Sequence, residues 1–233
     1  MGEKVQKCSL LHQWLTELLW FVYQIILRIH KYRILRADNT ELLSNAYAIL
    51  TKVYVMSGYI DPEQAQSELK DIFDSDSTVL LAKYKNEFVG TIKITPARYF
   101  KSSIFLYLTG FEQEVNSIVN LSVEIGRFAI LPSHRGGFLS IGMLLSAFIY
   151  AMREGSSFLL WTGSKSIYER LKQIIPDTRL IDAKPNDNGN KKFDGYFKKY
   201  GSVPVYIVPM CKVNINALAK YLFTEWISKI TIQ

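Results

Sequence analysis

One stretch near the middle of the chain constrains the fold more than any other, because a strand pattern, a turn and a helix-length segment follow one another in it. Residues 123–138 form an apolar run that carries Glu124 and Arg127 and then passes through two glycines. An apolar segment of helical length, residues 139–152, follows at once. Because backbone N–H groups point outward at a helix start, this order predicts a cradle for an anionic or amide-rich ligand.

Length and charge limit the class of protein. With 233 residues, 48% of them hydrophobic, the chain can bury one sizeable core and is too short for two enzyme domains. The net charge of +7 indicates either a mildly basic enzyme or an acidic partner, such as a carrier protein, an anionic membrane surface or a nucleic acid. The basic residues are dispersed and match no recognition motif, so we expect no nucleic-acid partner.

The cysteines and histidines predict no metal centre. Cys8 and Cys211 lie at opposite ends of the chain, which predicts neither a disulfide framework nor a metal knuckle and favours a reducing, cytoplasmic setting. His12, His30 and His134 have no ligand spacing. We therefore expect no structural metal.

An apolar helix is predicted near the start of the chain, because apolar side chains recur at helical spacing over residues 10–29. Glu17 and Gln24 keep its uninterrupted apolar run well below the roughly 20 residues of a transmembrane helix, and no signal-peptide cleavage pattern follows. Three roles stay open: a helix packed on the core, an interfacial membrane helix with a basic flank, and a dimer helix. We take residues 1–31 as this helical segment and residues 32–233 as the main domain.

The remaining periodicity predicts further strands and helices. Besides the strand that carries Glu124, we expect strands at 32–37, 78–84, 87–95, 157–162, 178–182 and 203–210, and helices at 41–59, 63–73, 139–152, 166–175 and 215–230. A tight link at Lys85 and Asn86 makes a hairpin of the second and third strands. Residues 101–121 form an irregular aromatic insertion that we expect to lie over the sheet as a short helix or flap.

This order of elements resembles the GNAT acyltransferase fold, and four motifs resemble one branch of it, the N-acyl amino acid synthases, relatives of the acyl-homoserine-lactone synthases. Residues 50–61 are similar to the family's Leu-Arg-x-x-Val-Tyr, 71–74 to its Asp-x-(Phe/Tyr)-Asp, 90–96 to its Gly-Thr-x-Arg-Leu-x-Pro, and 124–128 to its Glu-x-Ser-Arg-Phe. The resemblance implies an α/β (α+β) fold with a central mixed, mostly antiparallel sheet flanked by helices, to which the apolar N-terminal helix is added.

Three positions depart from the family pattern. Thr51 and Lys93 stand where the family has arginine, and Gly126 stands where it has serine. Lysine keeps the charge but loses the bidentate fork of arginine, so a substrate carboxylate or phosphate contact at Lys93 is less directional. The amine acceptor of this chain therefore need not be the family's usual one.

Glu124 is the candidate general base. Among apolar neighbours its charged form is disfavoured unless it is paired, and such a carboxylate suits the deprotonation of an amine; the alternative is a plain ion pair with Arg127 or another cation. A spacing of three residues places Glu124 and Arg127 on opposite sheet faces unless a bulge intervenes. Arg127 then either contacts substrate or pairs with Asp71 or Asp74, and these two carboxylates are either substrate contacts or solvated groups at a helix end.

The glycine turn bears on the acyl donor. Acetyl-CoA users of this fold carry Arg/Gln-x-x-Gly-x-Gly/Ala here, whereas the run Arg135, Gly136, Gly137, Phe138 places a phenylalanine where that pattern has a glycine. The weaker pyrophosphate grip favours the phosphopantetheine arm of an acidic acyl carrier protein, although an unusual glycine loop can still bind coenzyme A. The donor is an acyl-phosphopantetheine thioester in either case, and we expect no permanently bound cofactor.

Further residues complete the predicted site. Tyr168 matches the tyrosine that often protonates the leaving thiolate in this fold, with packing on the sheet as its alternative. Backbone N–H groups near Ile130 and Leu131 are predicted to polarise the thioester carbonyl. Met143, its helix neighbours and the aromatic insertion are predicted to wall the acyl chain.

These residues predict an N-acyltransferase that moves a fatty acyl group from a thioester to the amine of an amino acid or a similar small metabolite. Two alternatives stay open: a coenzyme A dependent acetyltransferase of a peptide or polyamine, and a membrane-docked, non-enzymatic binding module that uses residues 10–29. We expect a cytoplasmic protein, and peripheral membrane contact through that helix stays open.

Overall fold

The computed structural model describes residues 9–63, 69, 72–135, 138–162, 169, 172–186, 203–214 and 216–220. The strands are β1 (Tyr32–Arg36), β2 (Thr78–Tyr84), β3 (Glu87–Pro96), β4 (Leu108–Thr109), β5 (Ser122–Ile130), β6 (Phe158–Thr162), β7 (Arg179–Pro185) and β8 (Val203–Pro209). The α-helices are α1 (Leu10–Ile29), α2 (Thr40–Met56), α4 (Ser103–Tyr107), α5 (Glu112–Val115) and α6 (Phe138–Arg153), with short 3-10 turns that include η1 (Asp74–Asp76) and η4 (Pro132–His134). The helices expected at 63–73, 166–175 and 215–230 lie largely outside the described residues.

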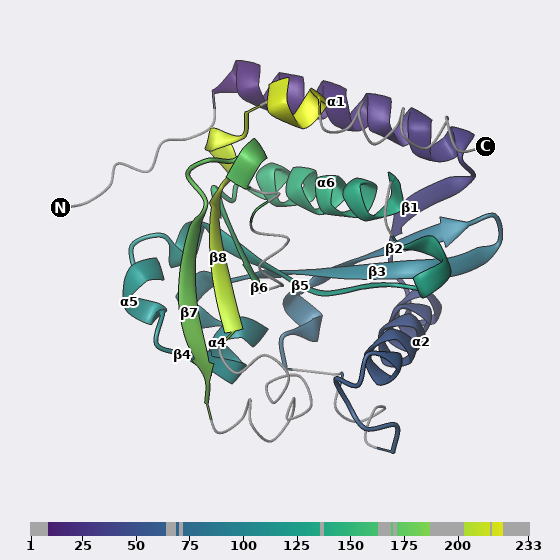
Figure 1. Cartoon of the computed structure of the whole chain (residues 1–233), viewed down its shortest axis with the longest axis horizontal. Helices are drawn as coiled ribbons and strands as arrows, with labels where there is room; N and C mark the ends of the chain where they lie inside the picture. Colours follow the sequence, from purple (N-terminus) through teal and green to yellow (C-terminus); the bar gives the residue numbers. More distant parts are fainter. Residues whose placement is uncertain are drawn as a thin grey trace.

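The strands form one sheet in the order β1-β2-β3-β5-β6-β8-β7-β4 (Figure 1). Within the described residues every neighbouring pair is antiparallel except β5 and β6, which run parallel. The predicted hairpin at 78–95 is confirmed as β2 and β3. The fold is therefore the mixed, mostly antiparallel sheet flanked by helices that the sequence predicts.

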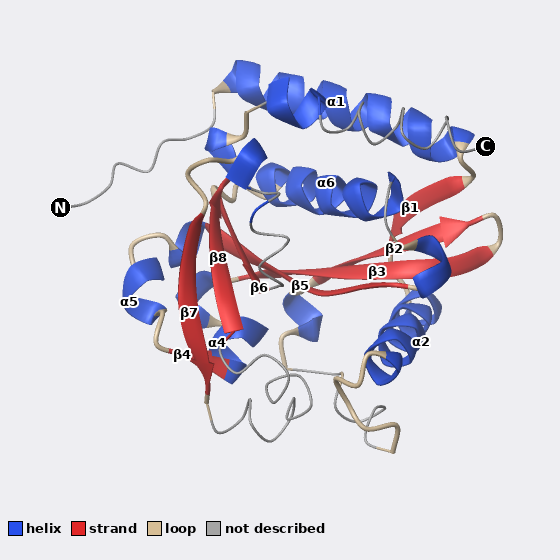
Figure 2. Ribbon diagram, viewed as in Figure 1, coloured by secondary structure: helices blue, strands red, loops and turns tan. Residues whose placement is uncertain are grey.

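The helices cover both faces of the sheet. In Figure 2, α6 lies on one face with α1 stacked above it, and α2 and α4 lie on the other face. Because α6 is enclosed between α1 and the sheet, it is apolar nearly all round, as a buried helix must be. The insertion at 101–121 contributes α4 and α5, whose apolar side chains pack with β6 and β8 in a separate cluster.

The predicted helix at 10–29 forms as α1, and its inner face packs on α6. The side chains of Tyr23 and Leu27 are fully buried there, and a Cβ added at Gly142 of α6 would lie 2.7 Å from Leu27 Cδ1 and 3.0 Å from Tyr23 Cε1. Glycine thus permits a close approach of the two helices. An ion pair of 2.6 Å between Glu17 and Arg153 also joins α1 to α6. Of the three roles left open for this helix, packing on the core is therefore the one that its inner face fulfils.

Two sequence expectations can be compared with the remaining described residues. None of the helices among them is long and apolar enough to cross a membrane. Cys211 is disulfide-bonded, so the expectation of unpaired cysteines is wrong and the argument for a reducing compartment loses its support.

Candidate active site

A bulge in β5 shapes the centre of the sheet. Between the pairs Lys93 with Gly126 and Thr91 with Ala129, β5 has one more residue than β3, and Arg127 has a left-handed φ of 50°. On its other edge β5 pairs with β6 only over Ser122–Ile125. Beyond that point, the β6-facing edge of β5 has no register partner among the described residues. The bulge foreseen as a condition for placing Glu124 and Arg127 together is present.

Glu124 lies just before the bulge, on the face covered by α2. Its neighbours Val123 and Ile125 pack in the cluster beneath α6, so alternation along the strand directs Glu124 to the opposite face. Only 8% of Glu124 is exposed. Its Oε2 accepts a hydrogen bond of 2.8 Å from the backbone N–H of Ile104, near the start of α4. The predicted insertion therefore supplies a donor that holds this buried carboxylate.

Gly126 makes room for the Glu124 carboxylate. A Cβ at position 126 would lie 2.8 Å from Glu124 Oε1, closer than two such atoms approach. The glycine that replaces the family's serine is therefore next to the candidate base. The side chain of Glu124 extends forward along its own strand and lies over this position.

A charged cluster occupies the same face of the sheet. Lys93 Nζ lies 2.5 Å from Asp74 Oδ1, and Arg127 Nη1 lies 3.3 Å from the same oxygen. The Tyr47 hydroxyl of α2 donates a hydrogen bond to the other oxygen of Asp74. Lys93 is 4% exposed and Arg127 10% exposed, so both cations are partnered by a carboxylate where water has little access. The pairing of Arg127 with Asp74, one of the predicted alternatives, is confirmed.

Tyr54 of α2 lies within electrostatic reach of both Glu124 and Arg127. Burial raises the pKa of Tyr54 to about 12, with the Arg127 charge lowering it and the Glu124 charge raising it. The phenol therefore keeps its proton at neutral pH and can donate a hydrogen bond in the site. Its ring packs edge-on against Tyr59 at a centroid distance of 5.5 Å.

The sequence prediction had not assigned roles to Tyr47, Tyr54 or the backbone of Ile104. The two tyrosines are seven residues apart and so lie on one face of α2, a signal present in the sequence. The Ile104 N–H could not be assigned because it depends on how the insertion packs. Asp71, Gly136, Gly137 and Tyr168 lie outside the described residues.

The predicted donor side needs one correction. The Leu131 N–H donates to the carbonyl oxygen of Val89 at 2.9 Å, so it is committed to β3 and cannot also polarise a thioester. Successive backbone groups point to opposite edges of a strand, so the Ile130 N–H points toward the β6 side. On that side Arg135 Nε donates to the Ile130 carbonyl oxygen at 2.9 Å.

Two other predicted donor residues are packed in the core. Phe138 stacks on His30 with ring centroids 4.4 Å apart, and its carbonyl oxygen accepts a hydrogen bond from the Tyr23 hydroxyl. Met143 is fully buried, and a Cβ at Gly90 would lie 2.9 Å from its sulfur. Packing is the role that the structure shows for both residues, and contact with an acyl donor stays a prediction.

Part of the chain matches a known protein family. The family described as N-acyl amino acid synthase FeeM matches residues 45–185, which include the β5 bulge and the charged cluster. No curated protein compared with the chain matches it.

Solved structures share the fold. The structure of FeeM, an N-acyl amino acid synthase from uncultured soil microbes, superposes with a TM-score of 0.56 at 11% identity, covering 77% of this chain and 91% of FeeM. The acyl-homoserine lactone synthase MesI, described as CoA-dependent, gives a TM-score of 0.53 at 15% identity, covering 82% of this chain and 95% of MesI. With the family match spanning more than half of its length, the chain belongs to the FeeM family of N-acyl amino acid synthases and is an N-acyltransferase of the GNAT fold.

Proposed function

We propose that this protein transfers a fatty acyl group from a phosphopantetheine thioester to the amine of an amino acid, with Glu124 as the general base. The observation that carries the proposal is the placement of Glu124. Its carboxylate is buried, is held by one backbone N–H, lies within electrostatic reach of the Tyr54 phenol, and shares its face of the sheet with the charged cluster around Asp74. A carboxylate with so little water around it can take a proton from an amine that binds beside it.

The charged cluster supports an acceptor that carries its own carboxylate. An arginine side chain has five N–H donors in a planar fork, so Arg127 can bind Asp74 and a substrate carboxylate at once. Tyr54 interacts with both Arg127 and Glu124. An α-amino acid whose carboxylate faces Arg127 and whose amine faces Glu124 matches this order of charges, and Lys93 adds positive potential.

Direct transfer then needs one base, one oxyanion donor and one acid. The amine nitrogen attacks the thioester carbonyl carbon, a C–N bond forms, and the amine proton passes to Glu124. The Ile130 N–H donates to the oxyanion of the tetrahedral intermediate. When the intermediate collapses, the C–S bond breaks and the thiolate takes a proton from Tyr168. The products are an N-acyl amino acid and a free thiol.

An acidic acyl carrier protein is the proposed donor. The net charge of +7 favours association with such a partner. Phe138 occupies the start of α6 and is buried against His30, where acetyl-CoA users of the fold have glycine. Because MesI is described as CoA-dependent, the experiment must compare acyl-CoA with the acylated carrier protein as donor.

The test is a turnover measurement with purified protein. Acyl carrier protein and acyl-CoA of equal chain length are each offered with a panel of amino acids, and the N-acyl product is measured by mass spectrometry. Glu124→Gln keeps the acceptor oxygen for Ile104 N–H but removes the base, so turnover is expected to fall by about 10²–10⁴.

Glu41→Gln, which changes an exposed carboxylate in the first turn of α2, is the matched control and is expected to keep full activity. Full turnover by Glu124→Gln would overturn the base assignment. Product formed only from acyl-CoA would overturn the donor assignment and leave the transfer reaction in place.

A further inference from the structure

The outer face of α1 is strongly apolar and exposed. Nine large hydrophobic side chains there are between 37% and 78% exposed: Leu10, Leu11, Trp14, Leu15, Leu18, Phe21, Val22, Ile25 and Ile29. They recur at helical spacing, opposite the buried Thr16, Tyr23 and Leu27. A helix of this length presents such a face along about 30 Å. A contiguous apolar surface of that kind indicates an interaction site.

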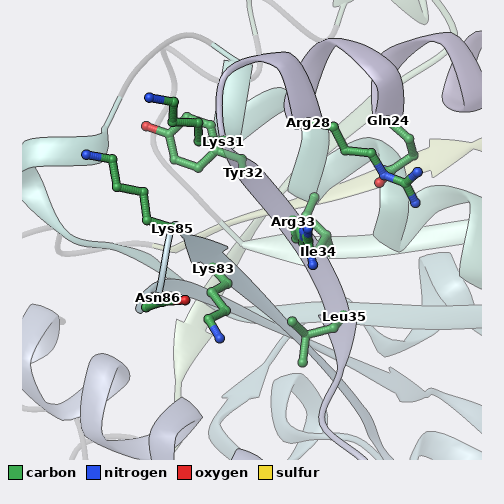
Figure 3. A pocket seen from close by; sticks show the side chains of 10 residues that line it. All are labelled: Gln24, Arg28, Lys31, Tyr32, Arg33, Ile34, Leu35, Lys83, Lys85 and Asn86. Atoms are coloured by element: carbon green, nitrogen blue, oxygen red, sulfur yellow. The ribbon is translucent and has the colours of Figure 1, made fainter.

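A basic pocket lies beside the C-terminal end of the same helix. It has a volume of about 830 Å³ and is lined by ten residues from α1, β1 and the β2–β3 hairpin. Five of the ten are cations and none is an aspartate or glutamate: Arg28, Lys31, Arg33, Lys83 and Lys85. Figure 3 shows these side chains around the hollow, with the ammonium groups of Lys31 and Lys85 extending in the same direction.

The strand register brings these cations together. Arg33 of β1 stands directly opposite Lys83 of β2, a like-charge pair that destabilises a sheet when nothing neutralises it. The turns beyond them meet as well, because the Lys85 N–H donates to the Lys31 carbonyl oxygen at 3.0 Å. Both of these lysines have a left-handed φ, 66° at Lys31 and 52° at Lys85. Four positive charges are thus gathered where an anion can relieve their repulsion.

We propose that α1 and the basic pocket dock the protein on a bilayer surface that carries anionic lipid headgroups. The apolar face of α1 enters the boundary between headgroups and acyl chains, and the five cations bind lipid phosphates at the end of the helix. A bilayer has an apolar layer next to a layer of phosphates, which match the apolar face of α1 and the basic pocket beside it.

A second copy of the chain or an acidic carrier protein would match only one of the two features, the apolar face of α1 or the basic pocket. In a two-fold dimer the apolar faces of the two α1 helices would cover each other, but the acidic side chain of α1, Glu17, is already paired with Arg153, so α1 of the copy offers no carboxylate to the basic pocket. An acidic carrier protein would match the basic pocket but would leave the long apolar face of α1 without a partner. Both occupants are outcomes of the test.

The test measures binding of the full chain to vesicles of phosphatidylcholine, with and without about one third phosphatidylglycerol, by co-sedimentation. Wild-type protein is expected to bind the anionic vesicles. Each cation near an anionic surface contributes about fivefold in affinity, so Arg33→Gln with Lys83→Gln is expected to weaken binding about thirtyfold. Leu18→Gln with Ile25→Gln, which removes two side chains from the apolar face, is expected to weaken it at least tenfold.

The control combines Lys52→Gln with Met56→Gln, which removes one exposed cation and one exposed apolar side chain from α2, a helix that contributes no residue to the pocket lining. It is expected to bind as wild type does. All variants are expected to unfold at or near the wild-type temperature and to keep wild-type turnover on soluble substrates. Glu124→Gln protein is expected to bind vesicles fully, so failure of the proposed reaction and failure of docking are distinguishable.

Three results would overturn the proposal. The first is no binding of the wild type to anionic vesicles. The second is a dimer in light scattering that Leu18→Gln with Ile25→Gln dissociates while vesicle binding is absent. The third is unchanged vesicle binding by Arg33→Gln with Lys83→Gln together with lost turnover from acyl carrier protein, which would assign the pocket to the carrier.

Discussion

Replacement of Gly126 by alanine is expected to give a stable but slow enzyme. The new Cβ would lie 2.8 Å from Glu124 Oε1, and ordinary contacts begin at 3.4 Å, so the carboxylate must retreat by about 0.6 Å. Its other oxygen accepts the Ile104 N–H at 2.8 Å, and the same displacement carries that bond to the limit at which hydrogen bonds lose their strength. A hydrogen bond to a charged group contributes about 1.5–3 kcal/mol, so Glu124 loses the contact that fixes it in place.

Stability and turnover should respond differently to this change. Alanine in a strand gains roughly 0.5–1 kcal/mol over glycine, which offsets part of the lost hydrogen bond and keeps the free energy of unfolding within about 2 kcal/mol of wild type. Turnover is expected to fall by about 10²-fold, because a displaced base no longer meets the amine. Urea unfolding and initial rates of N-acyl product formation measure the two quantities. A folded Gly126→Ala protein with wild-type kcat would refute the assigned position of the base.

Three more predictions concern the surroundings of the site. The pKa of Tyr54 in the folded protein is raised from 10.0 to about 12, so the raised pKa contributes fully to the free energy of unfolding below pH 10, and about 2–3 kcal/mol of that contribution is lost by pH 12. Tyr54→Phe should remove this loss, which is measured as the difference between the urea-unfolding free energies of the two proteins across that pH range. Asp74→Asn leaves Lys93 buried without that carboxylate and should lower the free energy of unfolding by about 3 kcal/mol. The same substitution should cost less unfolding free energy in a Lys93→Met background, and equal costs in the two backgrounds would contradict the pairing. Gly142→Val should lower the unfolding free energy by about 2 kcal/mol by separating α1 from α6, and a thermal melt that matches wild type would contradict their close approach at Leu27.

The strands and long helices were predictable because apolar residues recur along them, either at helical spacing or in short runs of strand length. The spacing of the apolar positions in 10–29 indicates α1, and the run at 87–95, which is buried on both faces of the sheet, indicates β3 almost without reference to the rest of the chain. The β5 strand and its carboxylate were predictable for the same reason. The bulge was only a condition in the prediction, because a left-handed φ at an arginine has no reliable local signal.

The partners of the site residues depend on tertiary contacts and were less predictable. Asp74 was expected as one of two possible partners for Arg127, and the structure adds Lys93 and Tyr47 to the same carboxylate. Leu131 was misassigned because the edge of the strand to which its N–H points depends on register, and the bulge shifts that register by one residue.

Two of the three departures from the family pattern act at one place. Lys93 and Gly126 are direct partners in the register of β3 and β5, so their side-chain positions lie opposite each other on the face that carries Glu124. The family's arginine and serine are both larger or more polar than the residues present, and the space over Gly126 is taken by the Glu124 carboxylate. Lysine reaches Asp74 as a single point charge and offers no second fork to a ligand. Under the proposed function, the two substitutions therefore change one acceptor-side contact together, next to the Glu124 and Arg127 that the bulge places on the same face.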